Sequence, residues 1–226
     1  MRASLDTNVI IHLYRAQEQR ILFDRFGNEL YIYEQIRKIE LENHAQDFLQ
    51  EFDRDLSEQK INLITDVSLK DMGVYSLFQK YVAENKLLYS PKDMGEIYAI
   101  SLAQTLRLLS IVTDDTKQGG PYMSLLQFPN SQVLPFTFVD ILILNYMDGT
   151  LSVKDTIAAF DNVNKSSSLN WSLNSHLSRF VKRFWKDPYL EKEKKWMLQY
   201  CNSQKIDAQR KLNDLIKHIK YIKYAA

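Results

Sequence analysis

The chain has 226 residues, of which 45% are hydrophobic and 25% are charged, and this composition predicts a folded domain with a core of its own. Its one cysteine cannot form an internal disulfide, so nothing in the sequence requires an oxidising compartment. No run approaches the roughly 18 apolar residues that span a bilayer, and Asp6 interrupts the short apolar start in a way that a signal peptide would not allow. We therefore expect a soluble cytoplasmic protein that does not bind a membrane.

The net charge is +1, but the charged residues are distributed unevenly along the chain. Residues 171–226 carry 13 Lys and Arg against 5 Asp and Glu, whereas the preceding residues carry 16 against 23. A basic tail on an acidic body can bring a polyanion to a site that would otherwise repel it. The tail is equally consistent with a plain pair of solvated helices.

The first part of the chain alternates short apolar runs with segments of helical periodicity. Strands are predicted at residues 2–5, 29–33 and 62–66. Helices are predicted over residues 8–20, over 34–59 and, as one or two helices, over 69–87.

The same alternation continues through the middle of the chain. Residues 90–93 (SPKD) are a helix-start signal, and the helix that follows leads to a continuous apolar strand at 108–113, as is typical of the middle of a parallel sheet. Gly119-Gly120-Pro121 breaks the chain before a fifth strand within 132–138 and a helix over 139–147. Strands that alternate with helices predict a parallel α/β sheet with right-handed crossovers.

The last part of the chain is predicted to be helical. The serine-rich segment 164–170 predicts a linker between a domain over residues 1–163 and a helical extension over 164–226. The extension begins with an amphipathic helix over about 173–184, which Asp187-Pro188 ends, and closes with a helix whose apolar stripe runs through 212–222.

Acids occur at three positions near the strand ends where an α/β sheet forms its ligand sites. Asp6 follows the first strand and Asp114-Asp115 follows the strand at 108–113, so both positions are carboxyl ends of strands. Glu96 lies in the first turn of the helix before that second strand. Converging carboxylates repel each other unless a cation neutralises them, and a set of oxygen ligands suits Mg²⁺ or Mn²⁺. The four histidines show no metal-ligand spacing.

Each acid also has a purely structural interpretation. Asp6 can cap the first helix, Glu96 can complement a helix dipole, and Asp114-Asp115 can form a turn. Because all three positions fall on one α/β pattern, we favour a shared site over coincidence.

Two segments of the chain resemble a PIN domain. SLDTNVIIHL (Ser4–Leu13) is similar to the opening of that family, and GEIYAISLAQTLRLLSIVTDD (Gly95–Asp115) is similar to its second half. The resemblance covers residues 2–140 and implies a three-layer α/β/α sandwich, a divalent metal ion and nuclease activity. The domain over 1–163 would then be the nuclease domain.

The resemblance assigns roles to individual residues. It matches Asp6, Glu96 and Asp114 to the catalytic, metal-binding acids of the family, with Asp115 as a further metal ligand beside them. The polar positions that orient these acids are matched by Thr7, Asn8 and Thr113.

The family has one more acid, on the helix after the second strand. Glu40, which precedes Leu41, is its best match as a catalytic and metal-binding residue, although the spacing from Ile36 is one residue longer than the family's usual pattern. Glu34 and Glu42 are the alternatives.

The implied activity is that of an endoribonuclease, with DNA a less favoured substrate than RNA. A bound metal ion lowers the pKa of its water and provides hydroxide near neutral pH. Candidate contacts to RNA phosphates are basic residues near the acids and in the tail, namely Lys92, Lys117, Lys182, Arg183 and Lys186. Aromatic residues of the tail can stack on bases, but Phe180 and Phe184 lie on an apolar face and are expected to pack.

Other interpretations remain open at this stage. A non-catalytic PIN-like module that binds RNA or a protein would share the fold but lack the acids. A phosphotransfer receiver is disfavoured because the acidic pair comes late in the chain, and an aspartyl phosphatase because Asn8 stands two residues after Asp6. Within the PIN family, the sequence leaves open a toxin silenced by an antitoxin, an RNA-processing enzyme and a homodimer.

Overall fold

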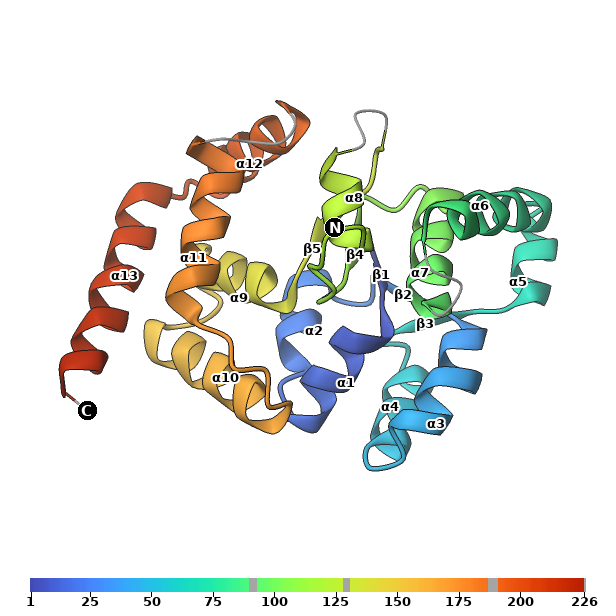
Figure 1. Cartoon of the computed structure of the whole chain (residues 1–226), viewed down its shortest axis with the longest axis horizontal. Helices are drawn as coiled ribbons and strands as arrows, with labels where there is room; N and C mark the ends of the chain where they lie inside the picture. Colours follow the sequence, from blue (N-terminus) through green and yellow to red (C-terminus); the bar gives the residue numbers. More distant parts are fainter. Residues whose placement is uncertain (90–92, 128–130, 187–190, 226) are drawn as a thin grey trace. The chain divides into compact units, whose positions relative to one another are not determined.

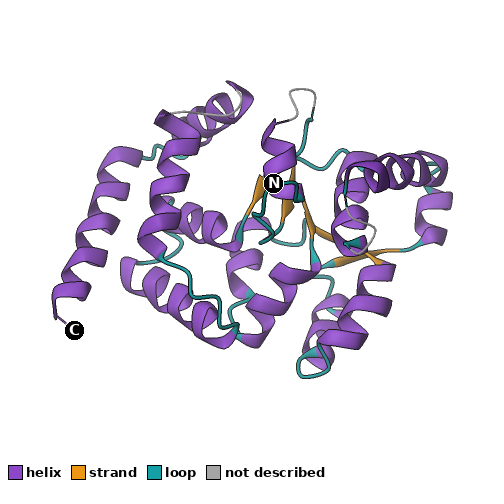
Figure 2. Cartoon of the chain, viewed as in Figure 1, coloured by secondary structure: helices purple, strands orange, loops and turns teal. Residues whose placement is uncertain are grey.

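The computed structural model describes residues 1–89, 93–127, 131–186 and 191–225. The chain forms two compact units, Met1–Phe138 and Val139–Ala226. The first unit contains the β-sheet with helices around it, and the second consists of helices (Figure 1, Figure 2).

The sheet of the first unit has five parallel strands in the order β3-β2-β1-β4-β5. The strands are β1 (Ala3–Leu5), β2 (Leu30–Tyr33), β3 (Asn62–Ile64), β4 (Ser110–Val112) and β5 (Leu134–Phe136). All residues of β1, β4 and β5 are buried, as continuous apolar runs in a parallel sheet require. Leu5 pairs with Val112, so the residues that follow β1 and β4 leave the sheet side by side.

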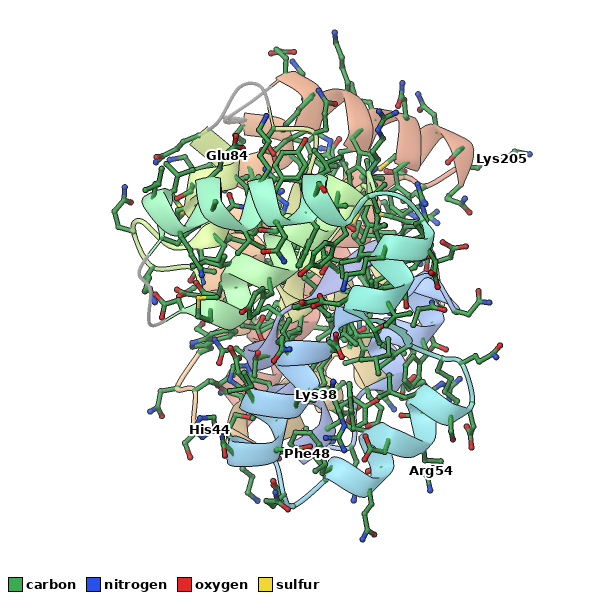
Figure 3. The ribbon with its side chains drawn as sticks, turned by 90° about the vertical axis from the view of Figure 1, so that its right-hand side faces the viewer. Lys38, His44, Phe48, Arg54, Glu84 and Lys205 are labelled. Atoms are coloured by element: carbon green, nitrogen blue, oxygen red, sulfur yellow. The ribbon has the colours of Figure 1, made fainter. Side chains whose placement is uncertain are left out.

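Helices and one π-helical segment, η1, connect these strands. They are α1 (Thr7–Arg15), α2 (Arg20–Phe26), η1 (Ile36–Leu41), α3 (Glu42–His44), α4 (Leu49–Ser57), α5 (Asp66–Asp71), α6 (Tyr75–Leu88), α7 (Met94–Thr105) and α8 (Pro121–Gln127). Charged residues on these helices, such as Arg54 of α4 and Glu84 of α6, lie on the outside (Figure 3).

Right-handed connections place α1, α2 and α4 over one face of a sheet with this strand order, and α6, α7 and α8 over the other. On the first face Tyr14 of α1 packs against Phe52 of α4, with ring centroids 5.3 Å apart. On the second face Tyr33 of β2 packs against Phe78 of α6 and Tyr98 of α7, at 4.7 and 4.9 Å. The predicted three-layer α/β/α sandwich with a parallel sheet is confirmed.

Two of the predicted helices are shorter than expected. The helix predicted over 8–20 ends at Arg15, because Gln17 adopts a left-handed φ of 57° and the chain turns before α2. The helix predicted over 34–59 is interrupted at residues 45–48, where Ala45 and Phe48 turn into the core. At residues 45–48 the burial of apolar side chains overrides the local helical pattern.

The second unit consists of α9 (Phe138–Met147), whose first residue belongs to the first unit, α10 (Val153–Ser166), α11 (Leu173–Val181), η2 (Lys182–Lys186), α12 (Glu191–Ser203) and α13 (Ala208–Ala225). The compact units meet in sequence at residue 138, whereas the predicted boundary at 163 falls within the last turn of α10. The predicted stop at Asp187-Pro188 lies outside the described residues. None of the helices in the described part of the chain has the length and apolar character that a bilayer crossing needs.

Candidate active site

Asp6 leaves β1 at its carboxyl end and is only 1% exposed. One carboxylate oxygen accepts a hydrogen bond from the Thr7 amide at 2.7 Å, which caps α1, and the other accepts one from Thr113 Oγ1 at 2.9 Å. Burial raises the pKa of Asp6 to about 7, and the charges of Glu40 and Asp114 add to this rise, while the two hydrogen bonds oppose it. The carboxylate that caps α1 is therefore the same one that lies at the predicted site.

Glu40 faces this site from η1. Thr7 Oγ1 donates a hydrogen bond to Glu40 Oε2, and the charge of Glu40 acts on Asp6. The two alternative acids are engaged elsewhere: Glu34 binds Lys38 and the Asp66 amide, and Glu42 pairs with Arg37. Among the three candidates, the structure thus brings Glu40 to Asp6.

The π-helical conformation of η1 accounts for the long spacing between Ile36 and Glu40. In this segment the Glu42 amide bonds to the Arg37 carbonyl, five residues back. A π turn takes up one more residue than an α turn, and such turns are frequent at functional sites. The extra residue is therefore absorbed within the helix.

Gly95 allows the first turn of α7 to lie directly against Glu40 and Thr7. A Cβ atom at this position would lie 2.6 Å from Thr7 Oγ1 and closer still to the Glu40 carboxylate. Only a residue without a side chain fits this close approach.

Glu96, in the same turn of α7, is 5% exposed. Burial raises its pKa to about 10, with further contributions from a hydrogen bond to Asp115 and from the charge of Asp6. In its protonated form Glu96 donates this hydrogen bond to Asp115, which accepts it as a carboxylate. Its Oε2 is buried and has no hydrogen-bond partner within the residues that the structure describes.

Asp115 is paired with a lysine. Lys117 Nζ lies 2.5 Å from Asp115 Oδ2 and 3.6 Å from Asp93 Oδ2, and its amide donates to Asp115 Oδ1 at 3.0 Å. Burial favours a higher pKa for Asp115, but hydrogen bonds from Glu96 and Lys117 outweigh it and lower the pKa below its usual value. Lys117, a predicted phosphate contact, is thus engaged by acids of the site.

Asp114 lies at the same edge, but both of its oxygens have protein partners. Oδ2 is 2.7 Å from His12 Nδ1, and Oδ1 accepts a hydrogen bond from the Phe138 amide at 2.9 Å. Sequence reasoning did not place His12 in the site. A lone histidine on an apolar helix carries no local signal of a partner 102 residues away.

The predicted polar residues differ in their contacts. Thr113 Oγ1 donates to Asp6 and accepts from the Asp115 amide at 3.2 Å, so it links the ends of β1 and β4. Asn8 is exposed on α1, and no contact within the described residues ties it to the acids.

The other predicted phosphate contacts lie elsewhere or are not described. Lys92 falls outside the described residues, and Lys182 and Lys186 are exposed on η2 in the second unit. Arg183 is 3% exposed, and its guanidinium is held by Glu193 and by Asp140 at 3.4 Å. A buried and paired arginine is not available to a phosphate, so the role predicted for Arg183 is corrected to a structural one.

The aromatic residues of the tail that were expected to pack do so. Phe180 and Phe184 are 1% and 0% exposed, and their rings lie 4.9 Å apart. They are therefore part of the core of the second unit.

Whether these residues fit a metal ion depends on donor chemistry and on spacing. The donors are carboxylates, which suit Mg²⁺ or Mn²⁺, and Glu96 Oε2 is buried without a partner in the described part of the chain. In their present positions, however, no three His, Cys, Asp or Glu side chains among the described residues are grouped as a metal site. The type of donor therefore suits a hard cation, whereas the positions of Asp6, Glu40 and Glu96 in this structure are not those of a metal site.

Comparisons of the chain with protein-family models, with curated proteins and with solved structures give no match. The function of the site has to be inferred from the residues of this chain.

Proposed function

We propose that the chain is a divalent-metal-dependent endoribonuclease that acts in the cytoplasm and binds Mg²⁺ or Mn²⁺ through Asp6, Glu40 and Glu96. The observation that carries this proposal is the convergence of acidic side chains from β1, η1 and α7 on one edge of a parallel sheet, where Glu96 presents a buried oxygen without a partner among the described residues. The resemblance of residues 2–140 to PIN domains supports the same chemistry.

The surrounding residues hold the acids in place. Thr113 and the Thr7 amide fix the two oxygens of Asp6, and the Thr7 hydroxyl fixes Glu40. When bound, a divalent ion would lower the pKa of a water molecule and stabilise negative charge on the phosphate. Asp114 acts as a positioning residue in this scheme, because it ties His12 and the start of α9 to the end of β4.

The test is cleavage of labelled single-stranded RNA, and of DNA of the same sequence, by the full chain with Mg²⁺, Mn²⁺ or EDTA. We expect cleavage of RNA that requires the metal and that Asp6→Asn slows by about a hundredfold or more, as the loss of a group acting on the transition state does. Asp24→Asn, an equal change of charge at an exposed residue of α2, should leave the rate unchanged. An unchanged rate in Asp6→Asn would remove this residue from the reaction.

A second candidate is a non-catalytic module that binds RNA or a partner protein. It is favoured by the ion pair of Asp115 with Lys117, which neutralises part of the site without a metal ion, and by the contact of Asp114 with His12, which occupies one oxygen of that acid. Thermal unfolding during a titration with Mn²⁺ separates the two. A rise in melting temperature that Asp6→Asn abolishes supports the nuclease, whereas no rise together with RNA binding in EDTA supports the module.

Two further measurements concern protein partners. Light scattering of the purified chain tests whether it forms a homodimer, and copurification with a small protein tests whether it has an antitoxin partner.

A further inference from the structure

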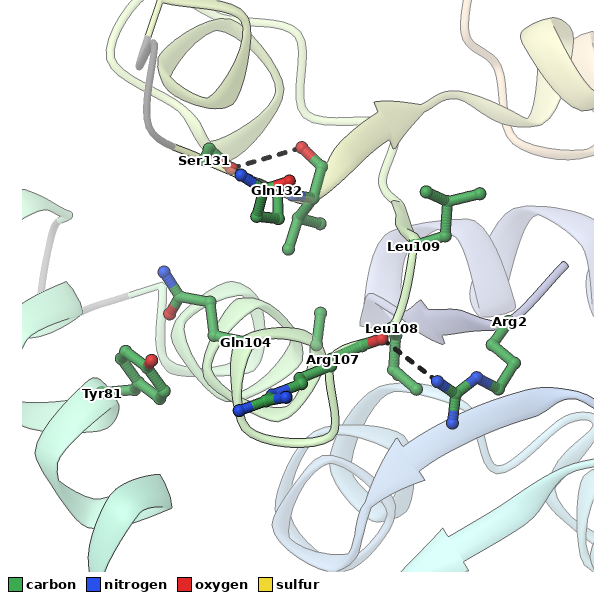
Figure 4. Close-up of a pocket in the computed structure, with 10 residues that line it drawn as sticks. Arg2, Tyr81, Gln104, Arg107, Leu108, Leu109, Ser131 and Gln132 are labelled. Atoms are coloured by element: carbon green, nitrogen blue, oxygen red, sulfur yellow. Dashed lines mark hydrogen bonds between the residues drawn. The ribbon is translucent and has the colours of Figure 1, made fainter. Parts of the chain in front are cut away.

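A cavity of about 680 Å³ lies at the amino edge of the sheet in the first unit (Figure 4). It is lined by Arg2 before β1, Leu109 before β4 and Val133 before β5, and by residues of α6 and the end of α7. The acids lie at the carboxyl ends of β1 and β4, which is the opposite edge. The volume falls within the range of about 300–1,000 Å³ that is usual for small-molecule sites.

The charged groups that line the cavity are arginines. Arg2 and Arg107 belong to its lining, and none of the described lining residues is Asp or Glu. Arg2 donates to the Arg107 carbonyl at 3.2 Å and also binds the Tyr31 hydroxyl. The guanidinium of Arg107 is exposed and has no side-chain partner among the described residues. A guanidinium in this situation matches the geometry of a phosphate.

Arg107 lies in the turn that follows α7 and has a left-handed backbone conformation. Its φ is 50°, it comes directly after the C-cap residue Leu106, and the Leu108 amide bonds to the Ala103 carbonyl at 2.9 Å. The left-handed conformation is one that glycine adopts without cost. In Figure 4 the side chain of Arg107 extends toward the part of the cavity lined by Tyr81 and Gln104, and Arg2 lies on the other side.

Planar and amide groups line the part of the cavity near Arg107. The Tyr81 ring belongs to the lining, together with the amides of Gln104 and Gln132. Asn85, which is 3% exposed, donates to Gln104 Oε1 at 2.9 Å and to Ser101 Oγ at 2.9 Å. This buried amide holds the Gln104 carboxamide through its oxygen at the wall of the cavity, on the side where Tyr81 also lies (Figure 4). An aromatic face beside amide donors and acceptors is what a nucleobase needs for stacking and edge recognition.

We infer that this cavity binds a nucleotide, with the phosphate at Arg107 and the base between Tyr81 and the amides of Gln104 and Gln132. The nucleotide is either free or the end of an RNA strand, since the two share this chemistry. The inference does not depend on the proposed nuclease activity, because none of the acids at the other edge takes part.

The test is calorimetry of the full chain in EDTA, which prevents metal-dependent cleavage. The probes are the four nucleoside 5′-monophosphates, the four nucleosides, inorganic phosphate and a 5′-phosphorylated RNA hexamer. We expect at least one monophosphate to bind, and its nucleoside and inorganic phosphate each to bind at least about tenfold more weakly, because each lacks one half of the recognised group. Binding of the hexamer in competition with the monophosphate would assign the cavity to RNA ends, and binding of the monophosphate alone would assign it to free nucleotides.

Variants distinguish this site from general attraction of anions. Arg107→Gln should weaken binding of the monophosphate about tenfold through loss of a charge-assisted hydrogen bond. The matched control is Arg20→Gln, which removes an exposed arginine of α2 and should have no effect. Arg107→Gly relaxes the left-handed backbone, so a loss of binding without a loss of thermal stability cannot come from unfolding. Equal binding by wild type and both Arg107 variants, or a monophosphate that binds no tighter than inorganic phosphate, would overturn the inference.

Discussion

At the scale of single residues, the candidate active site depends on a glycine, which has no side chain. Gly95 opens the first turn of α7 to the carboxylate of Glu40 and the hydroxyl of Thr7. The cation site that we propose therefore needs a close approach of backbone to carboxylate as well as acids. Two kinds of change should therefore weaken the same site: replacing one of its acids, or filling the space that Gly95 leaves open beside Glu40.

Replacing Gly95 with alanine should displace Glu40 without unfolding the chain. The Glu40 carboxylate is the end of a flexible side chain and can move away, whereas the Thr7 hydroxyl, 2.6 Å from the new Cβ, belongs to a short buried side chain and has to shift with it. Alanine favours a helix by roughly 1 kcal/mol over glycine, which offsets part of this cost. We expect Mn²⁺ affinity and RNA cleavage to fall about tenfold or more, while the chain still unfolds cooperatively in a thermal melt.

The partner variant is Glu40→Gln, measured alone and together with Gly95→Ala. If Gly95→Ala acts by displacing Glu40, it should reduce Mn²⁺ affinity and RNA cleavage little further in a chain that already carries Glu40→Gln, because changes at contacting residues are not additive. Full additivity of the two effects would show that Gly95 acts in another way.

Arg183 shows how burial changes the role of a basic residue. Its guanidinium is held between Glu193, which is 0% exposed, and Asp140, and it lies 4.6 Å from the centre of the Phe184 ring. Arg183→Met should destabilise the chain by about 3–5 kcal/mol, because it leaves a buried carboxylate without its cation. Lys182→Gln, at the exposed neighbour, should change stability by less than about 0.5 kcal/mol in the same urea unfolding experiment.

At the scale of elements, the conformation of a helix decides which residues reach a site. The six residues of η1 are wound as a π-helix, which places Glu40 at Thr7 although its spacing from Ile36 is long for the PIN pattern. In the second unit, α11 turns His176 into a buried position against Trp171, with ring centroids 4.7 Å apart. Each element thus determines the environment, and hence the chemistry, of one titratable side chain.

The burial of His176 predicts a dependence of stability on pH. Burial, and secondarily the charge of Arg179, lowers the pKa of His176 from 6.5 to about 4. The unfolded chain therefore takes up a proton below about pH 6.5 that the folded chain accepts only near pH 4, and the free energy of unfolding falls as the pH falls through this window. The contribution is fully present above pH 6.5 and reaches up to about 3 kcal/mol.

The measurement is the free energy of unfolding in urea at several pH values between 4 and 8, for wild type and His176→Gln. The difference in free energy of unfolding between wild type and His176→Gln should shrink as the pH falls. The other three histidines are present in both chains and therefore do not contribute to this difference. Parallel curves would contradict the assignment of this pH dependence to His176.

At the scale of the whole molecule, charge is divided between the two parts of the chain. The acids of the site belong to the first unit, and the basic residues after position 170 belong to the second. Lys217 and Lys220 of α13 are exposed. If the second unit binds RNA, we expect these lysines to contact the phosphates and not to recognise the bases.

The salt dependence of RNA affinity tests this role. With Asp6→Asn to prevent cleavage, the double change Lys217→Gln and Lys220→Gln should weaken binding of single-stranded RNA. It should also reduce the slope of log affinity against log salt by about 0.7 for each phosphate that the variant no longer neutralises. The control is Lys80→Gln on α6, which is exposed in the first unit. An unchanged slope in the double variant would exclude these two lysines from the RNA interface.

The sequence by itself determined the parallel sheet and the places where acids leave it. All five strands lie where apolar runs predicted them, and Asp6 and Asp114 follow β1 and β4 as expected, because burial patterns along a strand are local properties of the chain. Only the tertiary structure decided the partners of these residues. Contacts between distant segments determine the pairing of Asp114 with His12, the burial of Arg183 and the cavity whose lining includes Arg2 and Val133. These contacts are set by the packing of the core, which no local sequence pattern records.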